Sequence, residues 1–408
     1  MPQKTILMLG GSMQQVPAIE KAREMGLRTV LIDYLPDNPG QFAADKWYAE
    51  STTDIEAVMR IALAEKADGI LAYASDPAAL PAAIVAQKLG LPTNPPESVE
   101  ILGVKHKFRE FLKENGFACP ENFTFSPEDK FEYVEEGIKR LSFPIVVKPT
   151  DSSGSKGVSF ISDMSELRDA ISHAASYSRN KILIAEEFIE HGYPYVIGGD
   201  IFVENGKIVL YGDMECLRDN NGESLIPIGK KKNNGLTTLQ RNRLHTELQR
   251  IVTALDIQFG ELNIELLIDK DDRPHFLELG PRAGGNMIPI QLSDAFGIDL
   301  IKANIATAMG MPTEIHPVEP DESYMTFVLH SHSDGILDSI VFDPKIETYI
   351  YRTVLYKRQG DVVERFDGAG KALGIVFMKF PTRDMMNLME RQIDKLIVVN
   401  LSEPKQLL

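Results

Sequence analysis

The first hundred residues alternate between short apolar runs and stretches that have the spacing of amphipathic helices. The apolar runs at residues 5–9, 29–32 and 69–73 have the length of buried strands. Parallel strands need a crossover between them, usually a helix, so this alternation favours a doubly wound parallel sheet. We therefore expect an N-terminal α/β unit that ends near the proline-rich segment at residues 91–96.

The rest of the chain mixes helices with hairpins, which is typical of an α+β arrangement. One hairpin is expected over residues 195–213, because Asn205-Gly206 is a strong turn pair. Another is expected over residues 261–279, with an acidic turn. Runs typical of strands dominate again from residue 323, with a helix near 383–395. A chain of 408 residues has room for two or three domains.

The chain is acidic, with 43 basic and 59 acidic residues and a net charge of −16. This balance argues against nucleic acid and against an anionic membrane surface as partners, since both attract Lys and Arg. The sequence has no apolar run of about 18 residues and no signal-peptide pattern at its N-terminus. Cys119 and Cys216 lack the spacing of metal ligands, so we expect inert thiols and a cytoplasmic protein.

A lysine followed by a loop of small residues is the strongest local signal. Lys148 ends an apolar strand, and the loop that follows contains Ser152, Ser153, Gly154, Lys156 and Gly157. Small residues let backbone N–H groups approach a phosphate, and the lysines add positive charge. The Walker A pattern is absent, and a flexible hairpin turn is the alternative interpretation.

Two carboxylates lie on consecutive predicted strands. A turn centred between residues 271 and 272 would place Glu265 opposite Glu278 in an antiparallel pair. Side chains opposite each other on one face are about 5 Å apart, so the two charges repel unless a cation lies between them. Mg²⁺ takes carboxylate and phosphate oxygens as ligands. The pair therefore predicts a magnesium site, although two solvated acids at a strand edge are the alternative.

Two weaker signals complete the set. Arg282 follows Glu278 in a glycine-rich turn, and an arginine beside a metal site can bind a phosphoryl group or a carboxylate with both nitrogens. The segment 183–189 is an apolar strand that ends in Glu186 and Glu187. A strand end of this kind can offer backbone groups to adenine.

The order of these parts resembles the ATP-grasp superfamily, in its amino-acid ligase, biotin carboxylase-like and carbamoyl phosphate synthase-like branches. Residues 105–116 are similar to the helix that opens the family's ATP-binding unit. The resemblance implies that two lysines contact phosphate, that a flexible loop closes over it, and that a hinge holds adenine by its main chain. The ATP-binding residues would be Lys105, Lys148, Ser152, Ser153, Gly154, Lys156, Gly157, Glu186, Glu187, Phe188 and Ile189.

The same resemblance implies the chemistry. Glu265 and Glu278 would hold Mg²⁺, with Mn²⁺ as an alternative ion, and Arg282 and Lys148 would be the catalytic residues. An ATP-grasp ligase phosphorylates a carboxylate to an acylphosphate, releases ADP and joins the acyl group to an amine. The substrates would be small molecules, such as amino acids, and homodimers are common in the superfamily.

The resemblance also divides the chain into three parts. Residues 1–95 look like the family's preceding α/β domain, residues 96–310 like its ATP-binding unit, and residues 311–408 like its C-terminal α+β cap. The mobile lid of the ATP-binding unit would cover about residues 117–187. The expected fold class is therefore α/β and α+β, with a parallel N-terminal sheet and a β-rich cap.

Two positions depart from the family pattern. Gly280 stands where the family often has an asparagine that supports a second metal ion, which leaves Glu278 to bridge both ions. No acid lies near Pro194-Tyr195 to hold the ribose, so Glu190 or water would take its place.

Other functions remain open from the sequence alone. A biotin- or purine-type carboxylase uses the same fold, and a non-catalytic nucleotide or metabolite sensor is a further alternative. Gly10-Gly11-Ser12 with Asp33 lacks the full dinucleotide-binding pattern.

Four further features carry weaker expectations. Residues 219–234 are polar and predict a mobile loop, whose lysines 230–232 would be solvated or would meet phosphate. Glu215 would end the preceding strand, in a position to face the substrate. His330 and His332 share one face of a strand in a pattern compatible with a metal, but the sequence shows no third ligand.

Overall fold

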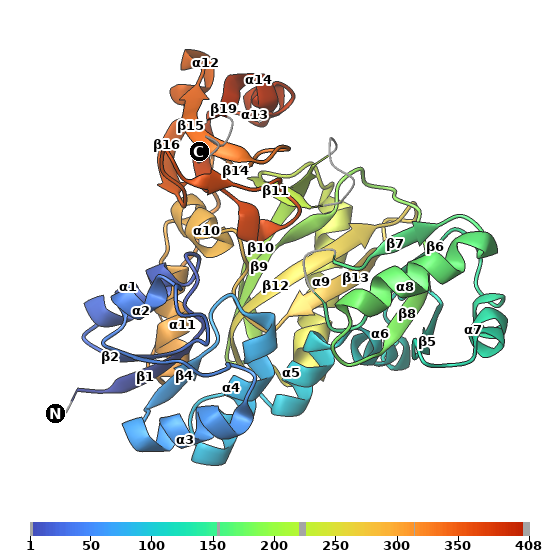
Figure 1. The fold of residues 1–408 in the computed structure, drawn as a ribbon, viewed down its shortest axis with the longest axis horizontal. Coiled ribbons are helices and arrows are strands. Elements are labelled where there is room, and N and C mark those ends of the chain that lie inside the picture. Colours follow the sequence, from blue (N-terminus) through green and yellow to red (C-terminus); the bar gives the residue numbers. More distant parts are fainter. Residues whose placement is uncertain (1–2, 153–155, 220–225, 314, 403–408) are drawn as a thin grey trace, which may run out of the picture.

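The computed structural model describes residues 3–152, 156–219, 226–313 and 315–402. Its N-terminal part is a four-stranded parallel sheet in the order β3-β2-β1-β4. The doubly wound α/β pattern expected from the sequence is confirmed, because helices separate these strands along the chain (Figure 1). The elements are β1 (Thr5–Leu9), α1 (Val16–Glu24), β2 (Arg28–Ile32), α2 (Gly40–Ala43), β3 (Lys46–Tyr48), α3 (Ile55–Glu65), β4 (Gly69–Leu71) and α4 (Asp76–Leu89).

The largest sheet has eight strands in the order β13-β12-β9-β10-β11-β14-β18-β16. All its neighbours pair antiparallel, and the hairpin turn at Asn205-Gly206 joins β9 to β10 as predicted. Strands on both sides of residue 311 therefore belong to one sheet. They are β9 (Ile197–Glu204), β10 (Lys207–Arg218), β11 (Pro227–Lys232), β12 (Phe259–Ile268), β13 (Pro274–Gly280), β14 (Ser323–Leu329), β16 (Ile350–Leu355) and β18 (Gly374–Phe380).

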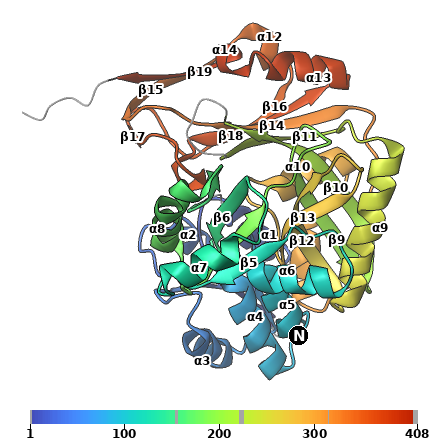
Figure 2. The same cartoon turned by 90° about the vertical axis from the view of Figure 1, so that its right-hand side faces the viewer.

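A separate four-stranded sheet, in the order β5-β8-β6-β7, lies in front of the large sheet in Figure 2. Its apolar core is closed by Ile138, Leu167 and Ala174 from the helices that pack on it. The elements are β5 (Asn122–Phe125), α7 (Phe131–Ile138), β6 (Ile145–Pro149), β7 (Ser159–Ile161), η1 (Met164–Glu166), α8 (Leu167–Tyr177) and β8 (Leu183–Glu187). We call this unit the lid sheet.

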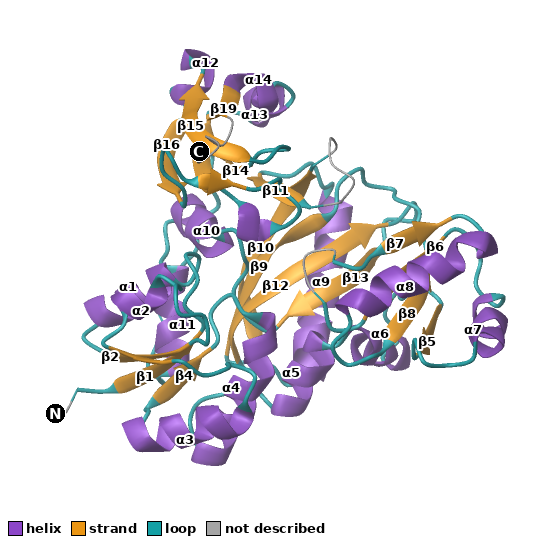
Figure 3. Ribbon diagram, in the orientation of Figure 1, coloured by secondary structure: helices purple, strands orange, loops and turns teal. Residues whose placement is uncertain are grey.

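Several helices pack against the large sheet, and those between residues 96 and 308 lie closest to the candidate site residues on β12 and β13 (Figure 3). The largest apolar cluster contains Phe108 and Leu112 of α6, Leu244 and Leu248 of α9, and residues of β9 and β12, such as Ile201. It holds α6 in place, and the first residue of α6 is Lys105. The helices are α5 (Pro96–Gly103), α6 (Lys105–Glu114), α9 (Thr238–Ala254), α10 (Ile288–Phe296) and α11 (Leu300–Ala308).

The C-terminal part adds a three-stranded sheet in the order β17-β15-β19. An apolar cluster that includes Val376, Met378 and Met386 joins it to the end of the large sheet. Among the described residues, no helix combines the length and the apolar character needed to cross a membrane. The remaining elements are β15 (Gly335–Phe342), α12 (Pro344–Glu347), β17 (Val362–Val363), η2 (Ala369–Lys371), α13 (Arg383–Glu390), α14 (Ile393–Leu396) and β19 (Ile397–Ser402).

The described part of the polar segment at 219–234 is not the mobile loop that its composition predicts. Residues 227–232 form β11, which pairs with β10 on one side and β14 on the other. Lys230, Lys231 and Lys232 are buried, with 8%, 1% and 3% of their surface exposed. The expectation of solvated lysines is wrong, because each lysine is partnered inside the protein. Residues 220–225 lie outside the described part of the chain.

Lys231 shows how these charges are accommodated. Its Nζ lies 2.8 Å from Glu215 and 2.9 Å from Glu390 of α13, and it lies over the ring of Tyr195. Glu215 is fully buried and also accepts from Arg383 at 2.9 Å. The expectation that Glu215 faces a substrate therefore does not hold, because this buried carboxylate joins the large sheet to α13.

The position of Lys231 generates a prediction about stability. Lys231→Met keeps the length of the side chain but removes the charge between Glu215 and Glu390. Breaking a buried ion pair leaves an uncompensated charge, which is strongly destabilising. Arg383 still contacts Glu215 in the variant and limits this cost. We therefore expect a loss of about 3 kcal/mol in the free energy of unfolding. Urea denaturation measures it. Lys139→Met, at an exposed helix pair, is the matched control and should leave the unfolding midpoint unchanged. Equal midpoints for both variants would contradict the prediction.

Candidate functional site

The two carboxylates predicted to face each other do so. In the antiparallel pair of β12 and β13, Glu265 is the register partner of Glu278. The register shifts by one residue between Glu265 and Leu266, so a β-bulge lies directly beside the pair. Bulges are frequent next to active sites, where they redirect a side chain.

A cation from another element contacts each carboxylate. Arg218, at the end of β10, donates from Nη2 to Oε1 of Glu265 at 2.6 Å. Lys105, at the start of α6, places Nζ 3.3 Å from Oε1 of Glu278. Burial by itself raises the pKa of the Glu265 carboxyl, but the charges of Arg218 and Lys230 outweigh burial and hold the pKa below its usual value.

This donor set fits a hard divalent cation. Two carboxylates on rigid, directly paired strands offer oxygen ligands of the kind that Mg²⁺ and Mn²⁺ prefer. Both carboxylates already attract positive charge, in the form of Arg218 and Lys105. The residues present therefore fit the metal that the sequence predicts here.

The second predicted phosphate lysine lies in a buried ion cluster. Lys148 on β6 contacts the carboxylate of Glu186 on β8, and Nε of Arg109 on α6 lies 2.6 Å from the same carboxylate. Burial raises the pKa of Glu186, but the charges of Arg109 and Lys148 outweigh burial and lower the pKa to about 2. Burial lowers the pKa of Lys148. Glu186 thus anchors the lysine with its side chain, in addition to its predicted place in the adenine hinge.

The remaining residues of the predicted adenine hinge, 187–189, come directly after Glu186 in the chain. Glu187 accepts from the backbone N–H of Ser142 at 2.7 Å. Phe188 is 44% exposed, stacks on His191 and contacts the edge of Phe160. Ile189 is half-buried beside it. An exposed aromatic ring at the end of β8 provides an apolar surface of the kind that adenine stacks on.

Part of the predicted phosphate loop is described. The backbone carbonyl of Ser152 accepts from Nζ of Lys105 at 2.5 Å, and the Ser152 hydroxyl donates to the carbonyl of Lys156 at 2.8 Å. Lys156 is exposed. Gly157 has a φ of +74°, and a Cβ there would lie 3.1 Å from the ring of Pro149, which explains the glycine. Ser153 and Gly154 lie outside the described residues.

Arg282 is held by a residue that the sequence did not single out. Nε and Nη2 of Arg282 donate to the two carboxylate oxygens of Asp76 at 2.7 and 2.6 Å. Burial raises the pKa of Asp76, but Arg282 outweighs it and the pKa is lowered. Asp76 begins α4, just after the carboxyl end of β4, and ligand-binding residues of parallel sheets gather at that edge. That rule is the signal by which Asp76 could have been found.

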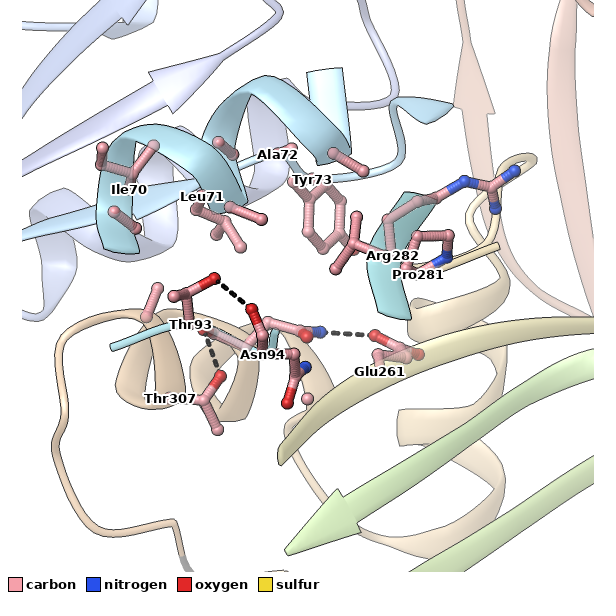
Figure 4. A pocket seen from close by; sticks show the side chains of 18 of the residues that line it. Ile70, Leu71, Ala72, Tyr73, Thr93, Asn94, Glu261, Pro281, Arg282 and Thr307 are labelled. Carbon is pink, nitrogen blue, oxygen red and sulfur yellow. Dashed lines mark hydrogen bonds between the residues drawn. The ribbon is translucent and has the colours of Figure 1, made fainter. Parts of the chain in front are cut away.

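A cavity of about 100 Å³ lies where Arg282 meets the N-terminal sheet (Figure 4). Tyr73, Glu261 and Thr307 line it together with apolar residues. Burial and the neighbouring charge of Asp200 raise the pKa of Glu261 well above its usual value. Ligand pockets are usually about 300–1,000 Å³, so this cavity is too small for a nucleotide. The residues predicted to bind ATP and metal lie instead on α6, on the lid sheet and on the pair β12–β13.

Comparison with known proteins places this geometry in a family. The model of the carbamoyl-phosphate synthase L chain, ATP-binding domain, matches residues 105–315, which begin at the first lysine of the site. The C-terminal section of the carbamoyl phosphate synthase large chain from Methanopyrus kandleri is 25% identical over 307 residues. That match covers 72% of this chain and 54% of the relative, so the chain spans about half the length of that curated relative.

Solved structures share the fold across nearly the whole chain. The L-amino acid ligase from Bacillus licheniformis superposes with a TM-score of 0.83 at 20% identity, covering 99% of this chain and 100% of that one. The biotin carboxylase domain of a 2-oxoglutarate carboxylase from Hydrogenobacter thermophilus, a dimer solved with MgADP and bicarbonate, has a TM-score of 0.75 at 17% identity. It covers 98% of this chain and 91% of that domain. The chain therefore has the ATP-grasp fold and belongs to the family of the carbamoyl-phosphate synthase L chain, ATP-binding domain.

Proposed function

We propose that the protein is an ATP- and magnesium-dependent ligase that phosphorylates a carboxylate to an acylphosphate, releases ADP and joins the acyl group to an amine. The observation that carries the proposal is the opposed pair Glu265 and Glu278, with Lys105 beside it. Phosphoryl transfer needs positioning and neutralisation of charge more than covalent help, and these groups provide both. Membership of an ATP-binding family supports the nucleotide.

The nucleotide would bind between the lid sheet and the large sheet. Lys105 and Lys148 attract the phosphates, and Glu186 with Arg109 keeps Lys148 in its place. The loop from Ser152 to Gly157 covers the phosphates and limits hydrolysis of the acylphosphate by water. The segment from Glu186 to Ile189 holds adenine, with Phe188 as its apolar surface.

Glu265 and Glu278 would hold Mg²⁺, which when bound neutralises phosphate charge and fixes the reacting phosphoryl group. Arg218 and Lys105 keep the two carboxylates oriented. Neighbouring cations, Arg218 first among them, outweigh the effect of burial and keep Glu265 ionised at neutral pH, since its pKa lies below the usual value. Glu265 therefore offers a charged ligand without first losing a proton.

Arg282 would bind the substrate carboxylate and then the charge that develops on the acylphosphate. Its guanidinium is already oriented by two hydrogen bonds to Asp76, so little entropy is lost when an anion binds. Asp76 acts as a positioning residue. The N-terminal α/β part therefore contributes, through α4, to the geometry of the reacting centre.

The finer assignments belong to the same proposal. A small carboxylate and a small amine, such as amino acids, are the expected substrates, with a homodimer as the assembly and the cytoplasm as the location. The decisive experiment offers purified protein with MgATP a matrix of carboxylates, bicarbonate included, against amines, and measures ADP release. ADP that appears only with a carboxylate–amine pair supports the ligase, ADP with bicarbonate supports a carboxylase, and no release with any member contradicts both.

Arg282→Ala tests the catalytic arginine. Removal of one group that stabilises developing negative charge costs about 10²–10³-fold in kcat, and we expect that loss in ADP release with the active substrate pair. ATP affinity, measured by calorimetry, should stay unchanged, because Lys105 and Lys148 remain. Arg60→Ala removes an exposed arginine with one surface partner and serves as the control. Normal turnover by Arg282→Ala would remove the assigned role.

Glu278→Gln tests the metal ligands. The amide keeps the shape of the side chain but loses its charge, so the Mg²⁺ concentration that gives half-maximal ADP release should rise at least about tenfold. Direct titration with Mn²⁺, followed by electron paramagnetic resonance, should show the same weakening. Glu322→Gln, at an exposed ion pair with Lys379, is the control. An unchanged metal requirement would contradict the assignment of Glu278.

A further inference from the structure

Two histidines that the proposed ligase does not use lie together with an aspartate. His330 and His332 follow β14 directly, and Asp219 follows the last residue of β10. One potential ligand atom from each of the three residues lies within 4.8 Å of the other two. The sequence shows the histidine pair but not its third member, because the large sheet brings Asp219 to it from the far side of β11.

One pair of these atoms already has nearly the spacing found in a metal centre. Nδ1 of His332 lies 3.6 Å from Oδ2 of Asp219. Zinc ligands bind at about 2.0–2.2 Å in a tetrahedron, which separates neighbouring ligand atoms by about 3.3–3.5 Å. Small rotations of side chains would therefore close the cluster around one ion, without movement of the strands.

His330 is oriented as a metal ligand would be. Its Nδ1 lies 2.7 Å from the backbone carbonyl of Val328. A donor at Nδ1 fixes the tautomer and leaves the lone pair of the ring on Nε2. Histidines that bind metals nearly always make such a bond with their other ring nitrogen. Phe366 packs against the same ring at 4.7 Å between centroids, which further restricts its rotation.

We propose that Asp219, His330 and His332 form a site for a divalent transition metal of the zinc class, with three protein ligands and an open fourth position. Two imidazoles favour Zn²⁺, Co²⁺ or Ni²⁺ over Mg²⁺, which prefers oxygen. This chemistry separates the site from the carboxylate pair Glu265 and Glu278. The proposal does not depend on the ligase function.

A metal bound here would connect two strands that are not neighbours. β10 and β14 lie on opposite sides of β11, and their ends carry Asp219 and His330. Arg218, the residue before Asp219, contacts Glu265 at 2.6 Å. Ligation of Asp219 would therefore restrain the backbone next to a residue of the candidate active site.

The test uses the protein freed of metal by a chelator and titrated with Zn²⁺ in excess Mg²⁺, which competes for carboxylate-only sites. Calorimetry should show one Zn²⁺ site, and Co²⁺ should produce the strong visible absorption of a four-coordinate complex. His332→Gln and Asp219→Asn each remove a ligand, so Zn²⁺ affinity should fall at least about tenfold, the loss found even for outer-shell partners. The Co²⁺ absorption should disappear with it.

Two control variants separate this site from others. His316→Gln alters an exposed histidine outside the cluster, and Glu278→Gln alters the carboxylate pair. Both should keep the Zn²⁺ affinity of the unaltered protein. The side chain of His332 is 44% exposed, so His332→Gln should fold. Its melting temperature, measured without metal, checks this. Zn²⁺ affinities of His332→Gln and Asp219→Asn equal to that of the unaltered protein would overturn the proposal.

Discussion

The candidate site depends on one constraint, the antiparallel pairing of β12 and β13 that forces Glu265 and Glu278 together. Two carboxylates opposite each other repel, and the cost of that repulsion rises as water is excluded. The chain offsets it with a cation from β10 and another from α6. The hairpin, the long strand and the helix therefore meet at these paired charges, and the two carboxylates offer oxygen ligands to a divalent ion.

Paired buried charges also attach the lid sheet to helix α6. Glu186 is buried between Arg109 of α6 and Lys148 of β6, so the carboxylate that fixes the lysine also ties the lid to the helix that carries Lys105. Removal of one partner from such a buried cluster is costly, because the remaining charge has lost its water. Both predicted phosphate lysines are thus positioned by α6 and its ion pairs.

Local patterns were enough to predict several of these features. The period of the apolar runs indicated the parallel sheet, and the symmetry of the acidic turn indicated that Glu265 faces Glu278, since both depend on neighbours in sequence. Asp76 and Arg109 were missed, because their partners are set by the tertiary fold. β11 was wrongly predicted to be a loop, because three consecutive lysines are usually solvated. The partners of Lys231, Glu215 and Glu390, are distant in sequence and are brought to it only by the tertiary fold.

The eight-stranded sheet has a consequence for how such a chain can be recombined. β11 precedes residue 311 and β14 follows it, yet the two strands pair directly from Gly229 with Phe327 to Lys232 with Tyr324. The C-terminal part is therefore not an independent domain joined by a linker, because it shares a sheet with the preceding residues. A chimera with a relative has to reproduce that register, or it leaves an open edge strand, which invites pairing with other chains. Exchange of substrate specificity between relatives is thus easier by point changes than by domain shuffling.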